Sequence, residues 1–167
     1  RWANDNVRSL FCADLEGLGN GAQQLIVGGL FDRAGGRVTG PIARWDGEAW
    51  HPFGTGLAGV DGAQVTAQCT DPSTSHLVAG GTFEQADGVQ LNGVASWDGQ
   101  SWSPLGLGIG PPPAVVLSLA AFDQDGTGPA PANVVAAGEF SEAGGTPANN
   151  IASWDGDHWQ AMGEGVH

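Results

Sequence analysis

The sequence predicts an all-β chain, a β-propeller-type array of three four-stranded antiparallel blades. The first observation is a nine-residue segment with the pattern apolar-Ala-x-Trp-Asp-Gly-x-x-Trp, which occurs at 42–50, 94–102 and 151–159. The second is a Gly-x-Phe block that precedes every copy. The third is the repeat length, about 52 and then about 57 residues, which lies in the range of propeller blades.

The repeats divide the chain into three expected blades, 1–59, 60–110 and 111–167, which together form one repeat domain. Because the blades share one pattern, we expect each blade to contribute its own part of the hydrophobic core, instead of one core formed by the whole chain. The chain has 29 glycines, 10 prolines and 7 tryptophans, a composition that suits many short strands joined by tight turns.

Each blade is expected to begin with two apolar strands. The first strands are expected at 7–12, 65–69 and 115–122, and the second strands at 25–27, 77–79 and 134–136. Every second strand runs into the Gly-x-Phe block. A glycine that closes a strand marks a close approach of a neighbouring backbone or ring, or a positive φ. The phenylalanine that follows is expected to pack there.

The second half of each blade is organised by two tryptophans. A loop of small residues is expected at 34–36, 86–88 and 143–145, and a third strand then ends in tryptophan. The Asp-Gly pair that follows predicts a type I′ hairpin turn into a fourth strand, which carries the second tryptophan. Six tryptophans are therefore expected to pack between adjacent sheets, whereas Trp2 is outside the pattern.

The motifs of one blade, taken together, show a resemblance. In the second blade they read GGTF at 80–83, VASWDG at 94–99, Trp102, and LGLG at 105–108. This string resembles the kelch-type propeller blade, and more closely the repeats of large secreted bacterial propeller proteins and of fungal Rax2-like cell-surface proteins. The resemblance covers nearly the whole chain. It implies a propeller fold and a secreted or cell-surface, extracytoplasmic location, and it brings no shared catalytic set.

The charge of the chain is acidic and unevenly distributed. The formal net charge is −13, with five arginines and no lysine, which argues against a nucleic-acid partner. The arginines all fall in the first blade and are Arg1, Arg8, Arg33, Arg37 and Arg44. The three blades carry about −1, −5 and −7. No apolar run reaches transmembrane length and the first residues do not resemble a signal peptide, so either a signal has been removed or this is a piece of a longer chain.

Three blades are too few for a closed propeller, which typically has about four to eight. Open ends would leave apolar sheet faces in water, and repeat arrays require caps, of which none is visible. In one interpretation, two copies associate head to tail as a homodimer with six blades, the Arg-rich first blade facing the acidic third blade of its partner. In the other, the missing blades belong to a longer chain or to another subunit.

The two cysteines, Cys12 and Cys69, do not lie in a metal-type CxxC pair. Aligned through Asp14, Asp71 and Asp123, they occupy the same position of successive blades. Equivalent positions of neighbouring blades usually lie farther apart than a disulfide spans. Two buried free thiols are therefore favoured, with a disulfide as the alternative.

The loops between the first and second strands are the best candidates for a metal site. Asp14 and Glu16 in the first blade, and Asp123 and Asp125 in the third, alternate along the chain and precede a glycine, as in loops that wrap Ca²⁺. Each loop offers only two carboxylates, and the second blade has Asp71 alone. A polar turn in which aspartate caps its own backbone is favoured, so no metal ligand and no cofactor are assigned.

Little in the sequence demands catalysis. It shows no Ser-His-Asp spacing, no nucleophile elbow and no HExxH, and we assign no catalytic or cofactor-binding residue. The histidines are His51, His76, His158 and His167. We expect a non-catalytic scaffold or binding module of a secreted or surface-associated assembly. The alternative is a lectin-like propeller that binds a glycan, or an enzyme, with its site at the central opening. The loops at 33–41, 85–93 and 142–150 differ most between blades and are the first candidates for a binding face.

Overall fold

The computed structural model describes residues 6–15, 23–59, 62–126, 128 and 131–167, and its regular structure is β-strand throughout. Three four-stranded antiparallel sheets follow one another along the chain, one in each repeat, and they do not close into a ring. The predicted fold class is confirmed. The described residues include no helix that could cross a membrane.

Each sheet is hydrogen-bonded in chain order from its first strand to its fourth. Blade one contains β1 (Asn6–Ala13), β2 (Gln24–Leu30), β5 (Ile42–Trp45) and β6 (Trp50–Pro52). Blade two contains β7 (Val65–Thr70), β8 (Leu77–Gly81), β11 (Val94–Trp97) and β12 (Trp102–Pro104). Blade three contains β13 (Val115–Phe122), β14 (Asn133–Glu139), β17 (Ile151–Trp154) and β18 (Trp159–Ala161).

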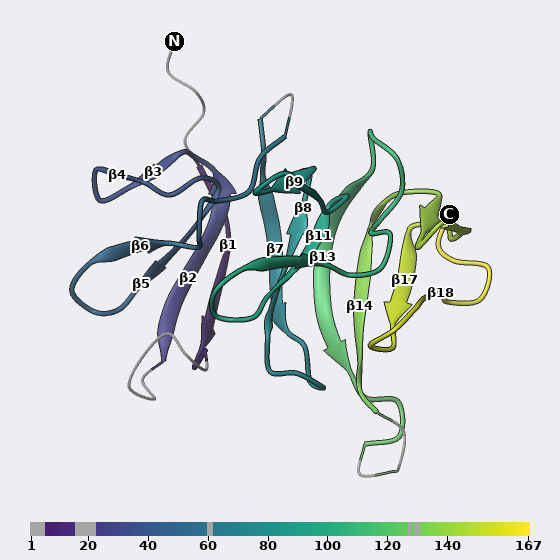
Figure 1. Ribbon diagram of the computed structural model, residues 1–167. Coiled ribbons are helices and arrows are strands. Elements are labelled where there is room, and N and C mark those ends of the chain that lie inside the picture. The colour runs from purple at the N-terminus through teal and green to yellow at the C-terminus, as the bar shows by residue number, and fades with distance from the viewer. Residues whose placement is uncertain (1–5, 16–22, 60–61, 127, 129–130) are drawn as a thin grey trace.

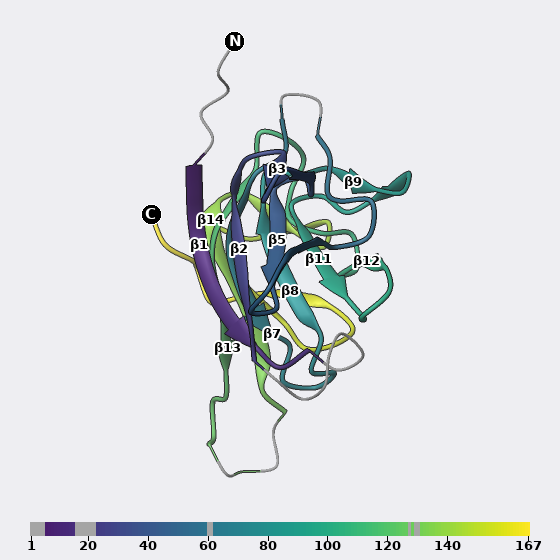
Figure 2. The same cartoon turned by 90° about the vertical axis from the view of Figure 1, so that its left-hand side faces the viewer.

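The three sheets fan out from their first strands (Figure 1). β7 lies between β1 and β13, whereas β6 and β18 point away to opposite sides of the view. In the second view the first strands gather toward one side of the molecule and β12 lies on the other (Figure 2). This is how propeller blades stand around an axis, with the first strand of each blade innermost.

A glycine near the end of the second strand allows the inner strands to approach. A Cβ on Gly28 would lie 2.6 Å from Val65 Cγ1 of the next blade, and a Cβ on Gly80 would lie 2.6 Å from Val116 Cγ1. No side chain fits in either place, so the predicted close approach is confirmed. The third blade differs, because its register puts Ala137 at the position of these glycines.

Between its second and third strands each blade has a small hairpin made of two strands, each two residues long, where the sequence analysis expects only a loop. The hairpins are β3 (Arg33–Ala34) with β4 (Arg37–Val38), β9 (Gln85–Ala86) with β10 (Val89–Gln90), and β15 (Glu142–Ala143) with β16 (Thr146–Pro147). Strands of two residues are too short to show an alternating pattern. The last two residues of each predicted loop form the turn, as in Gly35 and Gly36 with φ of 55° and 80°, whereas the alanine before them ends a strand.

The Asp-Gly connection differs from the type I′ turn that the sequence predicts. Gly47 has a φ of 104°, but Asp46 does not have a positive φ, and four residues separate the paired tryptophans. Asp46 Oδ1 instead accepts hydrogen bonds from the backbone N–H groups of Glu48 at 2.9 Å and Ala49 at 2.8 Å. Such bonds, above all, lower the pKa of the equivalent aspartates of all three blades below the ordinary range. These aspartates are Asp46, Asp98 and Asp155.

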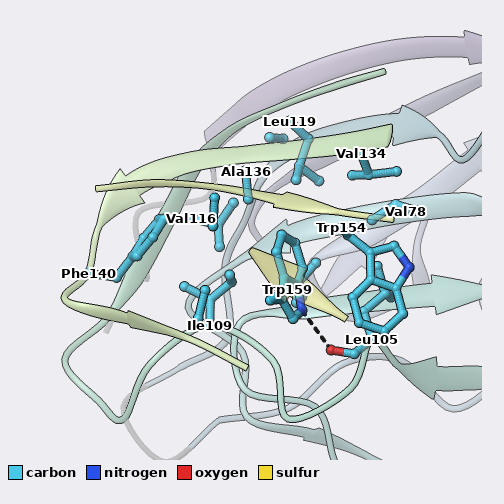
Figure 3. Packing of buried hydrophobic residues seen from close by; sticks show 14 of the residues in the cluster. Val78, Leu105, Ile109, Val116, Leu119, Val134, Ala136, Phe140, Trp154 and Trp159 are labelled. Carbon is cyan, nitrogen blue, oxygen red and sulfur yellow. Dashed lines mark hydrogen bonds between the residues drawn. The ribbon is translucent and has the colours of Figure 1, made fainter. Parts of the chain in front are cut away.

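The core lies between the sheets. One buried cluster joins blades one and two, and a second joins blades two and three. In the second cluster Trp154 and Trp159 of blade three pack with Leu105 and Ile109 of blade two (Figure 3). Packing of tryptophan between adjacent sheets, as predicted, is therefore confirmed for the later two blades.

The sheet register corrects the alignment of the two cysteines. Cys12 pairs with Leu25, but Cys69 pairs with Val78, although it is Leu77 that corresponds to Leu25. Because a shift of one residue reverses the face, the two cysteine side chains point to opposite sides of their sheets. Both thiols are free, Cys69 buried and Cys12 exposed, so the expected buried pair is wrong for Cys12. Burial is the main cause that raises the pKa of Cys69 to about 12.

Candidate interaction surfaces

Two internal junctions define how one blade binds the next. We call the face that contacts the preceding blade the leading face, and the opposite face the trailing face. At the first junction Phe53 and Leu57, on the trailing face of blade one, share a buried cluster with Phe83, Trp97 and Trp102 on the leading face of blade two. At the second junction the equivalent residues are Leu105, Ile109, Phe140, Trp154 and Trp159. The chain thus contains the same junction twice.

The trailing contact is made by a segment with the pattern apolar-Gly-x-Gly-apolar, which we call the blade-end segment. It occurs at 53–57, 105–109 and 162–166. The ring of Phe53 packs edge-on against Trp97, with centroids 5.5 Å apart. The indole Nε1 of Trp102 donates a hydrogen bond to Phe53 O at 3.3 Å, and Trp159 Nε1 donates to Leu105 O at 2.8 Å (Figure 3). Each junction therefore has an aromatic anchor with a satisfied polar group.

The first glycine of the blade-end segment lies against a tryptophan of the next blade. A Cβ on Gly54 would lie 3.1 Å from Trp97 Cζ3, and a Cβ on Gly106 would lie 3.0 Å from Trp154 Cζ3. A Cβ on Gly163, the third of these glycines, would have nothing within 4 Å. All three have similar positive φ, of 58°, 59° and 63°, so they share one backbone conformation and differ in what covers them.

The middle residue of the segment reaches the small hairpin of the next blade. Thr55 Oγ1 donates to Asp87 Oδ1 at 2.5 Å, and Leu107 Cδ1 would lie 3.2 Å from a Cβ on Gly145. Asp87 and Gly145 both lie in hairpin turns, between β9 and β10 and between β15 and β16. In the third blade-end segment the middle residue is Glu164.

Blade one presents its leading face without a preceding blade. Trp45 and Trp50 are only half-buried, whereas the four equivalent tryptophans are buried. On the inner strand Val7 is 56% exposed and Leu10 is 67% exposed. A cavity of about 290 Å³ opens on this face, and we call it the socket. Its lining includes Val7, Val27, Phe31, Arg33, Gly35 and Trp50.

Blade three presents its trailing face without a following blade. Met162 is 36% exposed and Val166 is 58% exposed, whereas their counterparts Phe53 and Leu57 are 0% and 5% exposed. The two open faces are therefore the two halves of the internal junction. One carries a socket, and the other carries the kind of segment that fills this position inside the chain.

The aspartates considered for calcium cap their own turns where the structure describes them. Asp123 Oδ1 accepts hydrogen bonds from two backbone N–H groups at 3.2 and 2.9 Å, and Asp71 Oδ1 accepts one from Ser73 N at 2.8 Å. The favoured interpretation is confirmed for both. Asp14 is exposed next to β1, and Glu16 lies outside the described residues. In the described ranges no three His, Cys, Asp or Glu side chains are placed to hold a metal ion.

The histidines of the described strands and loops lie apart, on three different blades. His51 Nε2 lies 2.6 Å from Asp46 Oδ2, and His76 Nδ1 lies 3.4 Å from Ser96 Oγ. His158 is exposed on the Asp-Gly loop of blade three. These contacts are local, and each joins residues of a single blade.

Two equivalent cavities lie where the chain passes from one blade to the next. They are lined in part by the ends of the loops 33–41 and 85–93, which were expected to form a binding face. The cavity between blades two and three measures about 260 Å³ and includes Thr82, Glu84 and Asn92. Thr82 Oγ1 is itself buried and has no hydrogen-bond partner among the described residues. The cavity between blades one and two measures about 270 Å³ and has Asp32 in the place of Glu84. The lining of neither cavity includes a tryptophan that could stack on a sugar.

The sequence analysis missed one buried polar group on the inner strands. Gln68 of β7 is 8% exposed, and neither atom of its amide has a hydrogen-bond partner in the part of the chain that the structure describes. Ser9 Oγ of β1 is also without a partner, and both side chains lie against Gly28. The register puts Leu10 and Leu119 at the position of Gln68 in the other blades. A glutamine at an otherwise apolar repeat position was the signal that could have identified it.

No family model, no curated protein and no solved structure matches this chain. The internal repeats therefore provide the comparison, because each paired face shows how an equivalent open face binds.

Proposed function

We propose that this chain is a non-catalytic propeller scaffold or binding module, of the kelch-like, Rax2-like type, in a secreted or surface-associated assembly. Its ring is completed by further blades that bind the two open faces. The observation that carries this proposal is the repetition of the junction: the socket beside Trp50 and the segment around Met162 are the two unpaired halves of a contact made twice inside the chain.

The energetics of the open faces support the same proposal. Aromatic and aliphatic side chains at these positions are buried at both internal junctions, and such burial contributes about 25 cal/mol for each Å² of apolar surface. Exposed apolar patches of this kind mark protein interaction sites. In the acidic loops, by contrast, a carboxylate oxygen of Asp71 and one of Asp123 accept hydrogen bonds from the backbone of their own loops. The supported function is therefore binding through blade faces.

A tandem chain tests ring completion without requiring separate copies to meet. A direct fusion of two copies leaves seven residues between Val166 and the next Val7, as many as separate Leu57 from Val65. We expect the tandem to melt at a higher temperature than the single chain, because its two added junctions bury the apolar faces that the single chain leaves open. The matched control is the same tandem with Met162→Asp in both copies, which should lose this gain. A tandem that melts at the same temperature as the single chain, at a concentration where the single chain is monomeric, would refute the proposal.

A second function, a lectin-like or enzymatic site, is favoured only by the cavity between blades two and three. Its lining includes Glu84, whose carboxylate can accept hydrogen bonds from sugar hydroxyls. A glycan array is the direct test, with Glu84→Gln as the site variant and Glu48→Gln on an exposed loop as its control. Saturable binding of one sugar that Glu84→Gln abolishes and Glu48→Gln leaves intact would replace the scaffold proposal. Absence of saturable binding would leave this cavity without support as a sugar site.

A further inference from the structure

We propose that the occupant of the open faces is a second copy of this chain. The blade-end segment 162–166 of each copy enters the socket of the other, so that two copies close one six-bladed ring through two identical junctions. This inference rests on the proposed function, because it names the partner that completes the ring. It also assigns a specific role to the one charged residue among the blade-end segments, Glu164.

The apolar part of the junction follows from the internal copies. Met162 stands at the position of Phe53 and Leu105, and Val166 at the position of Leu57. Their expected contacts are the half-buried tryptophans and Phe31 of the other copy, as at the internal junctions. Trp50 of one copy is then placed to donate its indole N–H to Met162 O of the other, as Trp159 donates to Leu105 inside the chain. The open socket and the exposed segment are thus complementary in shape and in hydrogen bonding.

Charge favours a second copy over an unrelated apolar partner. The middle residue of the blade-end segment reaches the next hairpin turn at both internal junctions, through Thr55 and Leu107. Glu164 should therefore reach the turn of β3 and β4, which is flanked by Arg33 and Arg37. Both arginines are exposed, and the Arg33 guanidinium already lies at this turn, 3.1 Å from Gly36 O. No equivalent arginine exists in the other hairpins, where Gln85 and Glu142 replace Arg33. The ionic contact is thus specific to the junction between copies.

Ring geometry is consistent with closure by two copies. Head-to-tail contacts use different patches on the two partners, and they close when the rotation per copy divides a full turn. Three blades per copy give a ring of six, within the range of about four to eight blades seen in propellers. Both open faces of both copies are then covered.

Ala137 makes the junction between copies looser than the internal ones at its inner edge. Gly28 and Gly80 occupy this position at the internal junctions, where a Cβ would lie 2.6 Å from a valine methyl of the next blade. The Ala137 methyl must therefore keep β14 farther from the partner's Val7. We expect reversible association that Ala137→Gly strengthens, with a lower dissociation constant.

Charge reversal in separate chains tests the inference by sedimentation velocity. Glu164→Arg, and separately the double variant Arg33→Glu with Arg37→Glu, should each weaken self-association about tenfold or more, because like charges then meet at both junctions. An equimolar mixture of the two variants should restore a dimer, since every junction of the mixed dimer pairs opposite charges. Asp157→Arg is the matched control, with the same charge change on an exposed loop, and it should dimerise normally. Arg37→Glu alone keeps the Arg33 bond to Gly36 and serves as a second variant.

The outcomes separate this inference from the function on which it rests. Pairing through Glu164 and the arginines would be refuted if the native chain sediments as a monomer. It would also be refuted if the mixture stays monomeric although circular dichroism shows that each variant is folded. Trimers or open polymers would refute closure by two copies. If the tandem chain still gains stability although the separate chain is a monomer, ring completion stands and its further blades come from another or a longer chain. If the tandem gains none, both proposals fail.

Discussion

Trp45 and Trp50 have the same local sequence as their counterparts in the later blades, yet they are only half-buried. The two rings contact each other with centroids 5.4 Å apart, as Trp97 and Trp102 do at 5.2 Å. What differs is the neighbour, because only blades two and three have a preceding blade in the described chain. The local geometry of a tryptophan pair is thus set by its own blade, and its burial is set by the preceding blade.

The loop aspartates predict a specific acid response. Their pKa values lie below the ordinary value of about 3.9 because backbone N–H groups stabilise the charged form. Their contribution to stability is therefore complete above the unfolded-state pKa and is lost as the pH falls through the lower folded-state pKa. We expect the free energy of unfolding, measured in urea, to fall from about pH 5 to about pH 2. The triple variant Asp46→Asn, Asp98→Asn and Asp155→Asn should show a shallower fall.

Asparagine keeps the capping oxygen but does not titrate in this range, so the slope isolates the charge. The control is Asp157→Asn, which removes the same charge from the same loop beside Asp155. It should leave the slope close to that of the native chain. An unchanged slope in the triple variant would show that other carboxylates govern the acid response.

At the scale of the element, the blade-end segment predicts unequal effects of equal substitutions. Gly106→Ala and Gly163→Ala both place alanine at a positive φ, which costs about 1–2 kcal/mol in either case. Only the Gly106 methyl would meet a tryptophan ring, 3.0 Å from Trp154 Cζ3. We expect Gly106→Ala to lower the free energy of unfolding by about 1–3 kcal/mol more than Gly163→Ala does. Urea unfolding at a concentration where the chain is monomeric measures the difference.

Equal losses in the two variants would mean that the contact between the segment and the tryptophan does not constrain the junction. At higher concentration Gly163→Ala should also weaken self-association, because its methyl then meets Trp45 of the other copy. The pair thus compares an internal junction with an intermolecular one at the same backbone conformation.

The elements themselves were largely predictable from the sequence. The strand expected at 115–122 is observed as β13 (Val115–Phe122), and the other first strands differ by a residue at their ends. Apolar runs identify such strands without tertiary information, and the Gly-x-Phe block marks the second strands. The small hairpins were not predictable, because a pair such as Arg33–Ala34 is too short to show a period. The Asp-Gly turn was mispredicted because the aspartate side chain, rather than a second positive φ, stabilises the loop.

The strand register and the contacts at the open ends cannot be predicted from an alignment of the repeats. Cys12 and Cys69 were aligned through the aspartates that directly follow β1 and β7, but β1 extends one residue further in the hydrogen-bond ladder, which shifts the two cysteines by one residue. The open ends were predicted from the number of blades. The contacts at these ends were not, because only the internal junctions show what the middle residue of a blade-end segment touches.

At the scale of the whole molecule, three blades form an open fan with one socket and one matching segment. β7, covered on both sides, is buried along most of its length, whereas β1 and β13 are largely exposed. The arginines of the first hairpin and Glu164 of the last segment lie at opposite ends of the chain. This distribution favours head-to-tail pairing, and it makes pairing sensitive to salt because exposed charges are screened.

The most direct test of ring completion by a second copy is the solution mass of the native chain, measured by light scattering over a concentration series at low and high salt. We predict a mass that rises to twice that of one chain and stops there, with dissociation shifted to higher concentration by salt. A mass that stays at one chain throughout, or that grows beyond two without a limit, would contradict the six-bladed ring.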